Sequence, residues 1–111
     1  MLITIVELPE FQKRSEKILT KDERDELMYF LAANPKSGVL IQHSGGIRKL
    51  RWRSKGKGKS GGSRIIYFFH SVEIPLFLLT LFTKNEKVNL SNSEKNELAK
   101  MTKILIKNYK R

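Results

Sequence analysis

Two dense apolar runs in the second half of the chain constrain the fold most. The segments SRIIYFFH (63–70) and LFLLTLF (76–82) are rich in β-branched, aromatic and leucine residues, and only SVEI and Pro75 separate them. Runs of this kind are typical of interior strands, and Pro75 has no N–H for a ladder, so it can only open the second run. The spacing therefore predicts a hairpin whose first strand is central in a sheet.

A strand with one dry and one wet face is predicted just before this hairpin. In IRKLRWR (47–53), Leu50 and Trp52 alternate with Lys49, Arg51 and Arg53. Successive side chains of a strand point to opposite faces, so these three cations are expected to share one face. Trp52 is then expected in the core rather than stacked on a base.

The flanking segments complete the fold. LITIVE (2–7) predicts a first strand, and two helices follow, the second opening at a capping box of Thr20 and Glu23; a similar box at Ser91 and Glu94 opens a closing helix. This order predicts one α+β domain over residues 1–111, with an antiparallel-rich sheet of about four strands. The N-terminal helical hairpin and the C-terminal helix are expected on one face, which leaves the other face open.

Charge indicates the class of partner. The chain has 22 Lys and Arg against 11 Asp and Glu, a formal net charge of +11, and RKLRWRSKGKGKSGGSR (48–64) holds eight bases and no acid. This excess favours a polyanion, with nucleic acid ahead of an acidic membrane. The most apolar run, residues 74–82, is nine residues long, against roughly 20 for a spanning helix.

The glycine-rich part of the basic stretch leads into a strand and not a helix, which argues against a nucleotide phosphate loop. A merely solvated loop is the simpler alternative, but it does not explain the cationic strand before it or Arg64 after it. We therefore expect phosphate contacts from residues that position RNA: Arg48, Arg53, Lys55, Lys57 and Lys59.

Metal chemistry has no support in the sequence. There is no cysteine, and His43 and His70 have no ligand spacing, so we expect no metal and no cofactor. The lack of cysteine also fits a cytoplasmic protein.

Five segments in register resemble the HigB branch of the RelE superfamily, the toxins of type II toxin–antitoxin modules. They are Asn34-Pro35, GGIRK (45–49), the basic glycine loop, GGSRIIY (61–67) and KNE (84–86). The resemblance implies a RelE-like fold and a metal-independent endoribonuclease that cuts mRNA in the A site of the 70S ribosome. It also implies a cognate HigA-like antitoxin, helix-turn-helix-containing or partly disordered, through which alone the complex meets operator DNA.

The same resemblance assigns candidate catalytic residues: Lys49 and Arg51 on the basic strand, Arg64 after the loop and Lys84 at the end of the last strand. Some relatives carry a tyrosine after that strand, where this chain has TKNEKVNLS. The acid and base roles are therefore unassigned, with Tyr67 and Lys84 as the alternatives. A lysine crowded by other cations has a lowered pKa and is suited to act as a base.

Two other function classes fit the composition. One is a basic RNA- or ribosome-binding module without catalysis, which would leave transcripts intact. The other is a domain that binds acidic proteins, which would lose RNA affinity at moderate salt.

Overall fold

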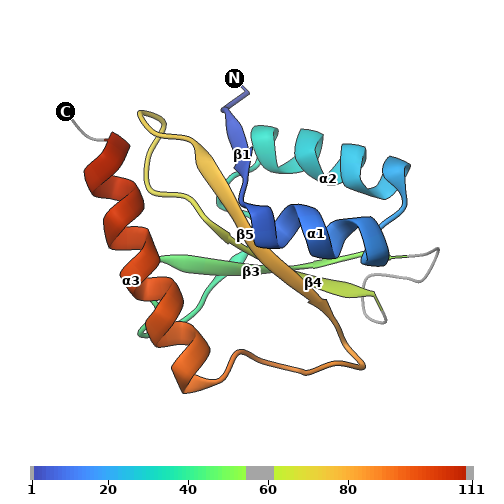
Figure 1. Cartoon of the computed structure of the whole chain (residues 1–111). Coiled ribbons are helices and arrows are strands. Elements are labelled where there is room, and N and C mark those ends of the chain that lie inside the picture. Colours follow the sequence, from blue (N-terminus) through green and yellow to red (C-terminus); the bar gives the residue numbers. More distant parts are fainter. Residues whose placement is uncertain (1, 55–61, 110–111) are drawn as a thin grey trace.

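The protein is a twisted sheet with helices on both sides (Figure 1). The computed structural model describes residues 2–54 and 62–109. The elements in these ranges are, in chain order, β1 (Ile5–Glu7), α1 (Pro9–Ile18), α2 (Lys21–Ala33), β2 (Val39–Leu40), β3 (Ile47–Trp52), β4 (Ser63–Phe68), β5 (Leu76–Thr83) and α3 (Asn92–Tyr109).

The sheet has five strands in the order β1-β5-β4-β3-β2. β1 runs parallel to β5, and the other neighbours are antiparallel. All six residues of β4 are buried, so the predicted central strand and its hairpin with β5 are confirmed. The extra strand relative to the prediction is β2, a two-residue edge strand paired with β3.

The helix starts follow local chemistry. Thr20 Oγ1 accepts from the Glu23 backbone N–H at 3.1 Å, and Glu23 Oε1 accepts from the Thr20 backbone N–H at 2.9 Å. Ser91 and Glu94 make the same reciprocal pair at 3.1 and 2.9 Å. Each box satisfies two backbone donors that a helix N-terminus leaves without partners, and both predicted capping boxes are confirmed.

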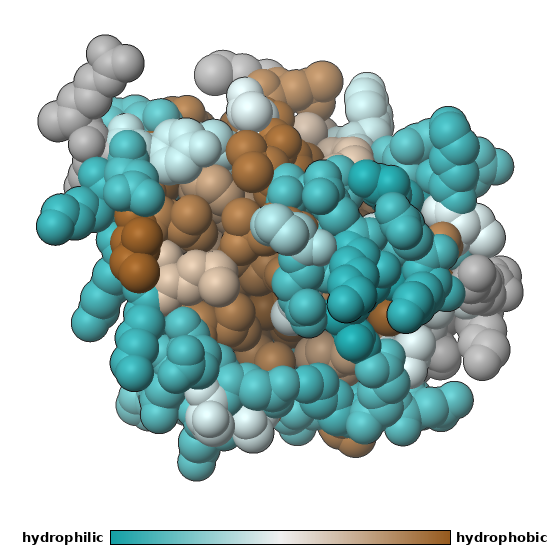
Figure 2. Space-filling view, in the orientation of Figure 1, coloured by the Kyte–Doolittle hydropathy of each residue, from teal (hydrophilic) through white to brown (hydrophobic). Residues whose placement is uncertain are grey.

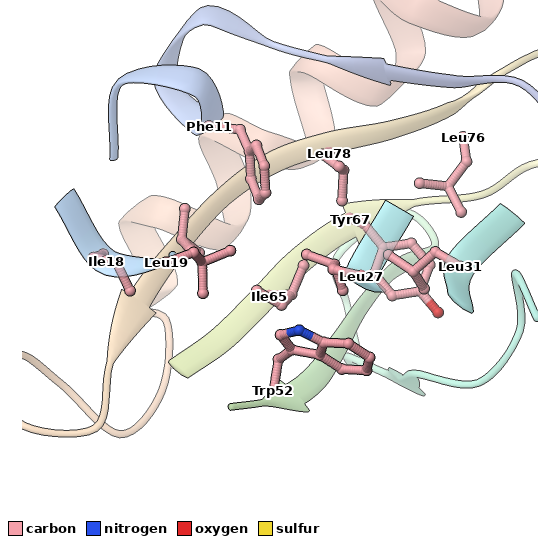
Figure 3. Close-up of a cluster of buried hydrophobic side chains, with 11 residues drawn as sticks. Phe11, Ile18, Leu19, Leu27, Leu31, Trp52, Ile65, Tyr67, Leu76 and Leu78 are labelled. Carbon is pink, nitrogen blue, oxygen red and sulfur yellow. The ribbon is translucent and has the colours of Figure 1, made fainter. Parts of the chain in front are cut away.

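One hydrophobic layer joins α1 and α2 to the sheet (Figure 3). Phe11, Leu27 and Leu31 are fully buried there against side chains of β3, β4 and β5. Trp52 also lies in this layer, 7% exposed, and its indole N–H donates to the Glu23 carbonyl at 3.0 Å. The predicted core role of Trp52 is confirmed.

A second layer packs α3 on the opposite face of the sheet. The predicted α+β class is confirmed, but the expectation that all helices share one face and leave the other open is wrong. The cause is in β4 and β5, where Ile66, Phe68 and Leu79 point away from α1 and α2 and are buried. These side chains require an apolar cover, which Leu98 and Leu105 of α3 help to provide.

Tyr67 ties the sheet to the segment before β2. Its side chain is fully buried, its hydroxyl donates to the Pro35 carbonyl at 2.8 Å, and it accepts from the Gly38 N–H at 2.8 Å. A Cβ on Gly38 would lie 2.8 Å from the Tyr67 ring and hydroxyl, so this approach requires glycine.

We predict that Tyr67→Phe lowers the free energy of unfolding by about 1 to 3 kcal/mol, because the buried Gly38 N–H loses its acceptor. Urea denaturation measures this change. Tyr29→Phe is the matched control, since the Tyr29 side chain is 69% exposed, and it is expected to leave stability unchanged. Equal effects of the two substitutions would contradict the assigned role of the Tyr67 hydroxyl.

Candidate functional site

The pairing of β3 with β4 brings basic side chains together on the face that α3 covers. Arg51 lies directly opposite Arg64, and Lys49 lies opposite Ile66. Side chains alternate along a strand, so Lys49 and Arg51 share the face of Ile47, and Arg64 shares the face of Ile66. The structure thus brings three of the four predicted catalytic residues to one face.

Arg64 is the most enclosed of these cations, with 6% of its surface exposed. Its position in the central strand explains this burial, because Arg51 flanks it on β3 and Phe82 flanks it on β5. A guanidinium is suited to such a place, since it remains charged when partly desolvated and presents several donors in a fixed plane.

The surroundings of Lys49 shift the pKa of its ammonium group. Partial burial, followed by the charges of Arg64, Arg51 and Lys95, lowers the pKa of the Lys49 ammonium below its ordinary value. Lys95 belongs to the first turn of α3, so this helix adds a fourth cation to the face. We call Lys49, Arg51, Arg64 and Lys95 the cationic cluster.

An amide faces the cluster. Asn89, in the segment between β5 and α3, accepts a hydrogen bond from Lys49 Nζ to its Oδ1 at 2.8 Å. Neither Lys95 nor Asn89 is among the site residues predicted from the sequence. They lie about forty residues from Lys49 in sequence, and no short motif reports such a contact. The periodicity of α3 alone does not show that Lys95 lies near Lys49. That follows only once α3 is known to cover this face of the sheet.

Two predicted RNA-binding residues have other surroundings. Arg48 alternates with Lys49 and so lies on the face of Leu50 and Trp52, where its Nη1 donates to the carbonyls of Lys36 at 3.1 Å and Gly38 at 2.8 Å. Arg53 follows the last residue of β3, and its Nη2 pairs with Glu26 of α2 at 2.9 Å. The structure does not bring either residue into the cationic cluster.

Lys84, the fourth predicted catalytic residue, lies at the end of the sheet. Lys84 directly follows β5, is exposed, and its backbone N–H donates to the Gly62 carbonyl at 3.3 Å, next to the start of β4. Lys55, Lys57 and Lys59 lie outside the described residues.

The remaining titratable candidates are Tyr67, His70 and His43. Tyr67 points into the layer under α1 and α2, and burial raises the pKa of its phenol. His70 packs near the Phe68 ring, with 6.2 Å between ring centroids, and His43 has a left-handed backbone with φ of 59°. Within residues 2–54 and 62–109, no group of three or more His, Cys, Asp or Glu side chains is placed to hold a metal ion.

Comparisons with known proteins show the family and the fold of the chain. A family model described as the RelE toxin of the RelE/RelB toxin–antitoxin system matches residues 10–111. The chain belongs to the RelE toxin family. Among solved structures it is similar to a double mutant of the E. coli toxin RelE in the free state, at 16% identity and a TM-score of 0.59, over 92% of this chain and 98% of that one. This likeness concerns the fold, and it confirms the predicted RelE-like architecture.

This RelE-family chain also has an apolar groove of about 540 Å³ between α1, β5 and α3, visible as a brown band in the middle of Figure 2. Its lining includes Leu81, Phe82 and Leu90, with the carboxylates of Glu10 and Glu97 at its margin. No residue of the cationic cluster lines it, so the groove is separate from the candidate site. None of the helices in the described ranges has the length and apolar character to cross a membrane.

The cationic cluster is expected to lower the stability of this RelE-family chain, because like charges directly opposite on neighbouring strands repel. We predict that Arg51→Gln raises the free energy of unfolding by about 0.2 to 1 kcal/mol at low salt, and that added salt reduces the gain by screening. Urea denaturation at two ionic strengths measures both effects.

Arg53→Gln is the control for this prediction, since it removes a cation that is paired with Glu26. It is expected to give no gain in stability. The proposed repulsion would be contradicted if Arg51→Gln lowered the free energy of unfolding by as much as Arg53→Gln does.

Proposed function

We propose that the chain is a toxin of the HigB branch and acts as a metal-independent endoribonuclease that cuts mRNA in the ribosomal A site. The observation that carries the proposal is the crowding of Lys49, Arg51 and Arg64 on one face of the sheet, where Lys49 has a lowered pKa. Membership of the RelE toxin family supports the same activity. A group of neighbouring cations suits the binding of phosphates.

The chemistry needs only the RNA and these side chains. The neutral amine of Lys49 takes the proton of the ribose 2′-OH, and the 2′-oxygen forms a bond to the adjacent phosphorus. The bond from phosphorus to the 5′-oxygen breaks, and that oxygen takes up a proton from an acid. Arg64 and Arg51 stabilise the negative charge that builds up on the phosphate oxygens. Lys84 is our candidate for the acid, because it is an exposed cation at the end of β5 beside the start of β4.

Partners follow from the same proposal. The ribosome presents the mRNA, and a cognate antitoxin encoded nearby blocks the toxin and carries the contact with operator DNA. The antitoxin acts by covering the cationic cluster or by adding bulk that prevents entry to the A site. An adjacent small open reading frame with a helix-turn-helix would support this part of the proposal.

The first functional prediction concerns Arg64. Arg64→Ala is expected to reduce cleavage on programmed ribosomes by about a hundredfold or more, as removal of one transition-state donor does. Arg64→Lys keeps the charge but loses the planar pair of donors, so we expect an intermediate loss. Mapping of transcript ends and single-turnover rates measure the effect.

Lys21→Ala is the control for Arg64, because Lys21 is exposed on α2 at the other face of the sheet. It should cleave at the wild-type rate. Thermal unfolding reports whether Arg64→Ala is folded, and a folded Arg64→Ala protein with full activity would rule out the assigned role.

The second functional prediction concerns pH. If the Lys49 amine is the base, the single-turnover rate rises with pH until Lys49 has lost its proton and then levels off. Lys49→Arg keeps a permanent cation, so we expect RNA binding to survive while the rising limb and most of the activity disappear. A rate that falls as the pH increases through the same range would instead mean that Lys49 acts as a protonated cation.

A basic RNA- or ribosome-binding module without catalysis is the second candidate, favoured by the net charge alone. It predicts that induced expression leaves transcripts intact and growth unaffected. The toxin predicts growth arrest and transcript cuts that require active translation.

A further inference from the structure

Asn89 is held in place from both sides along the chain. The next residue, Leu90, is buried in the layer under α3, and Ser91 is fixed by its capping box with Glu94. Lys87, two residues before Asn89, forms an ion pair with the same Glu94. It also lies over the Phe82 ring, 5.1 Å from its centroid. The amide that meets Lys49 is thus carried by an anchored segment.

The contact restricts the orientation of the Lys49 nitrogen. A lysine amine without its extra proton has two N–H bonds and one lone pair in tetrahedral directions. One N–H is directed to Asn89 Oδ1 at 2.8 Å, so the lone pair must point elsewhere. A single acceptor at a fixed position therefore limits the directions from which Nζ can take a proton.

The chemical type of the acceptor also matters. Lys49 is faced by Arg51 on its own strand, by Arg64 on β4 and by Lys95 on α3. A carboxylate at position 89 would oppose the effect of these three cations and hold the proton on Lys49. An amide oxygen accepts a hydrogen bond of similar length without a formal charge, so it holds Nζ while leaving the repulsion intact.

We propose that Asn89 is a positioning residue for Lys49, which fixes the direction of its Nζ toward the reacting ribose without placing a negative charge beside it. The role in cleavage rests on the proposed endonuclease. The contact itself does not, and it is testable in the protein without RNA.

The test compares Asn89→Asp, Asn89→Ala and wild type in the full chain. The first readout is NMR titration of the Lys49 side chain, followed through its ε-carbon. Asn89→Asp places a charge against Nζ, so the Lys49 midpoint is expected to rise by about one pH unit. Asn89→Ala removes the acceptor without adding a charge, so the midpoint is not expected to rise.

Asn108→Asp is the charge control, because it adds the same carboxylate in the last turn of α3, at the opposite end from Lys95. In Asn108→Asp, the titration midpoint of Lys49 should match that in wild type. A midpoint in Asn89→Asp that stays with the control would overturn the proposed contact.

The second readout is the pH profile of RNA cleavage on programmed ribosomes. In Asn89→Asp the rising limb should move to higher pH by the same amount as the NMR midpoint, which lowers the rate at neutral pH about tenfold. In Asn89→Ala the rate should fall at every pH, with no move of the limb to higher pH. Wild-type profiles in both variants would overturn the positioning role.

The two readouts separate this proposal from the proposed function. If wild type cuts no RNA while the Lys49 midpoint moves only in Asn89→Asp, the endonuclease fails and the contact is supported. If wild type cuts RNA and the midpoint does not move, the endonuclease is supported and the role of Asn89 fails.

Discussion

The register between β3 and β4 is the constraint on which the rest of the structure depends. It sets Trp52 beside Ser63 and Arg51 beside Arg64, and thereby separates an apolar face of β3 from a cationic one. The indole of Trp52, bonded to α2 and buried with Leu27, fixes this register from the dry side. A slip by one residue would turn Lys49 and Arg51 into the layer under α1 and α2, where unpaired charges are costly to bury. The hydrophobic core on one side of the sheet thus determines the electrostatics on the other.

This arrangement concentrates like charges where the fold is otherwise most apolar. β4 is buried along its whole length, yet one of its six positions is Arg64. Placing Arg64 there costs free energy through charge repulsion and desolvation. The packing of the two hydrophobic layers offsets this cost. Acids elsewhere in the chain pair with other bases, as Glu7 does with Arg24 and Glu86 with Arg14. Arg14 and Arg24 of the first two helices are therefore neutralised locally, while Lys49 and Arg51 have Arg64 as a neighbour.

The main helices and strands and part of the candidate site could be predicted from the sequence. Alternation in IRKLRWR identified Lys49 and Arg51, but it also included Arg53, because the pattern does not show that the strand ends at Trp52. Arg48 was grouped with its neighbours by charge, although its position in the alternation places it on the other face. The second helical layer was missed because a closing helix with an apolar stripe fits either side of a sheet. The contact of Asn89 with Lys49 depends on how the segment after β5 folds back, which no local periodicity records.

In the proposed mechanism, the free site and the RNA-bound site place opposite demands on Lys49. In the free protein, partial burial and then the neighbouring cations lower the pKa of Lys49, whereas in the proposed complex a bound phosphate would bring negative charge that favours the protonated amine. In the proposed complex, phosphate binding would release part of the repulsion among the cations, so the same interaction that lowers stability would contribute to affinity. The remaining cations then determine how much of the shift survives in the complex. A second negative group beside Lys49 would remove it, which is the physical reason that a neutral amide, and not a carboxylate, suits position 89 in the proposed mechanism.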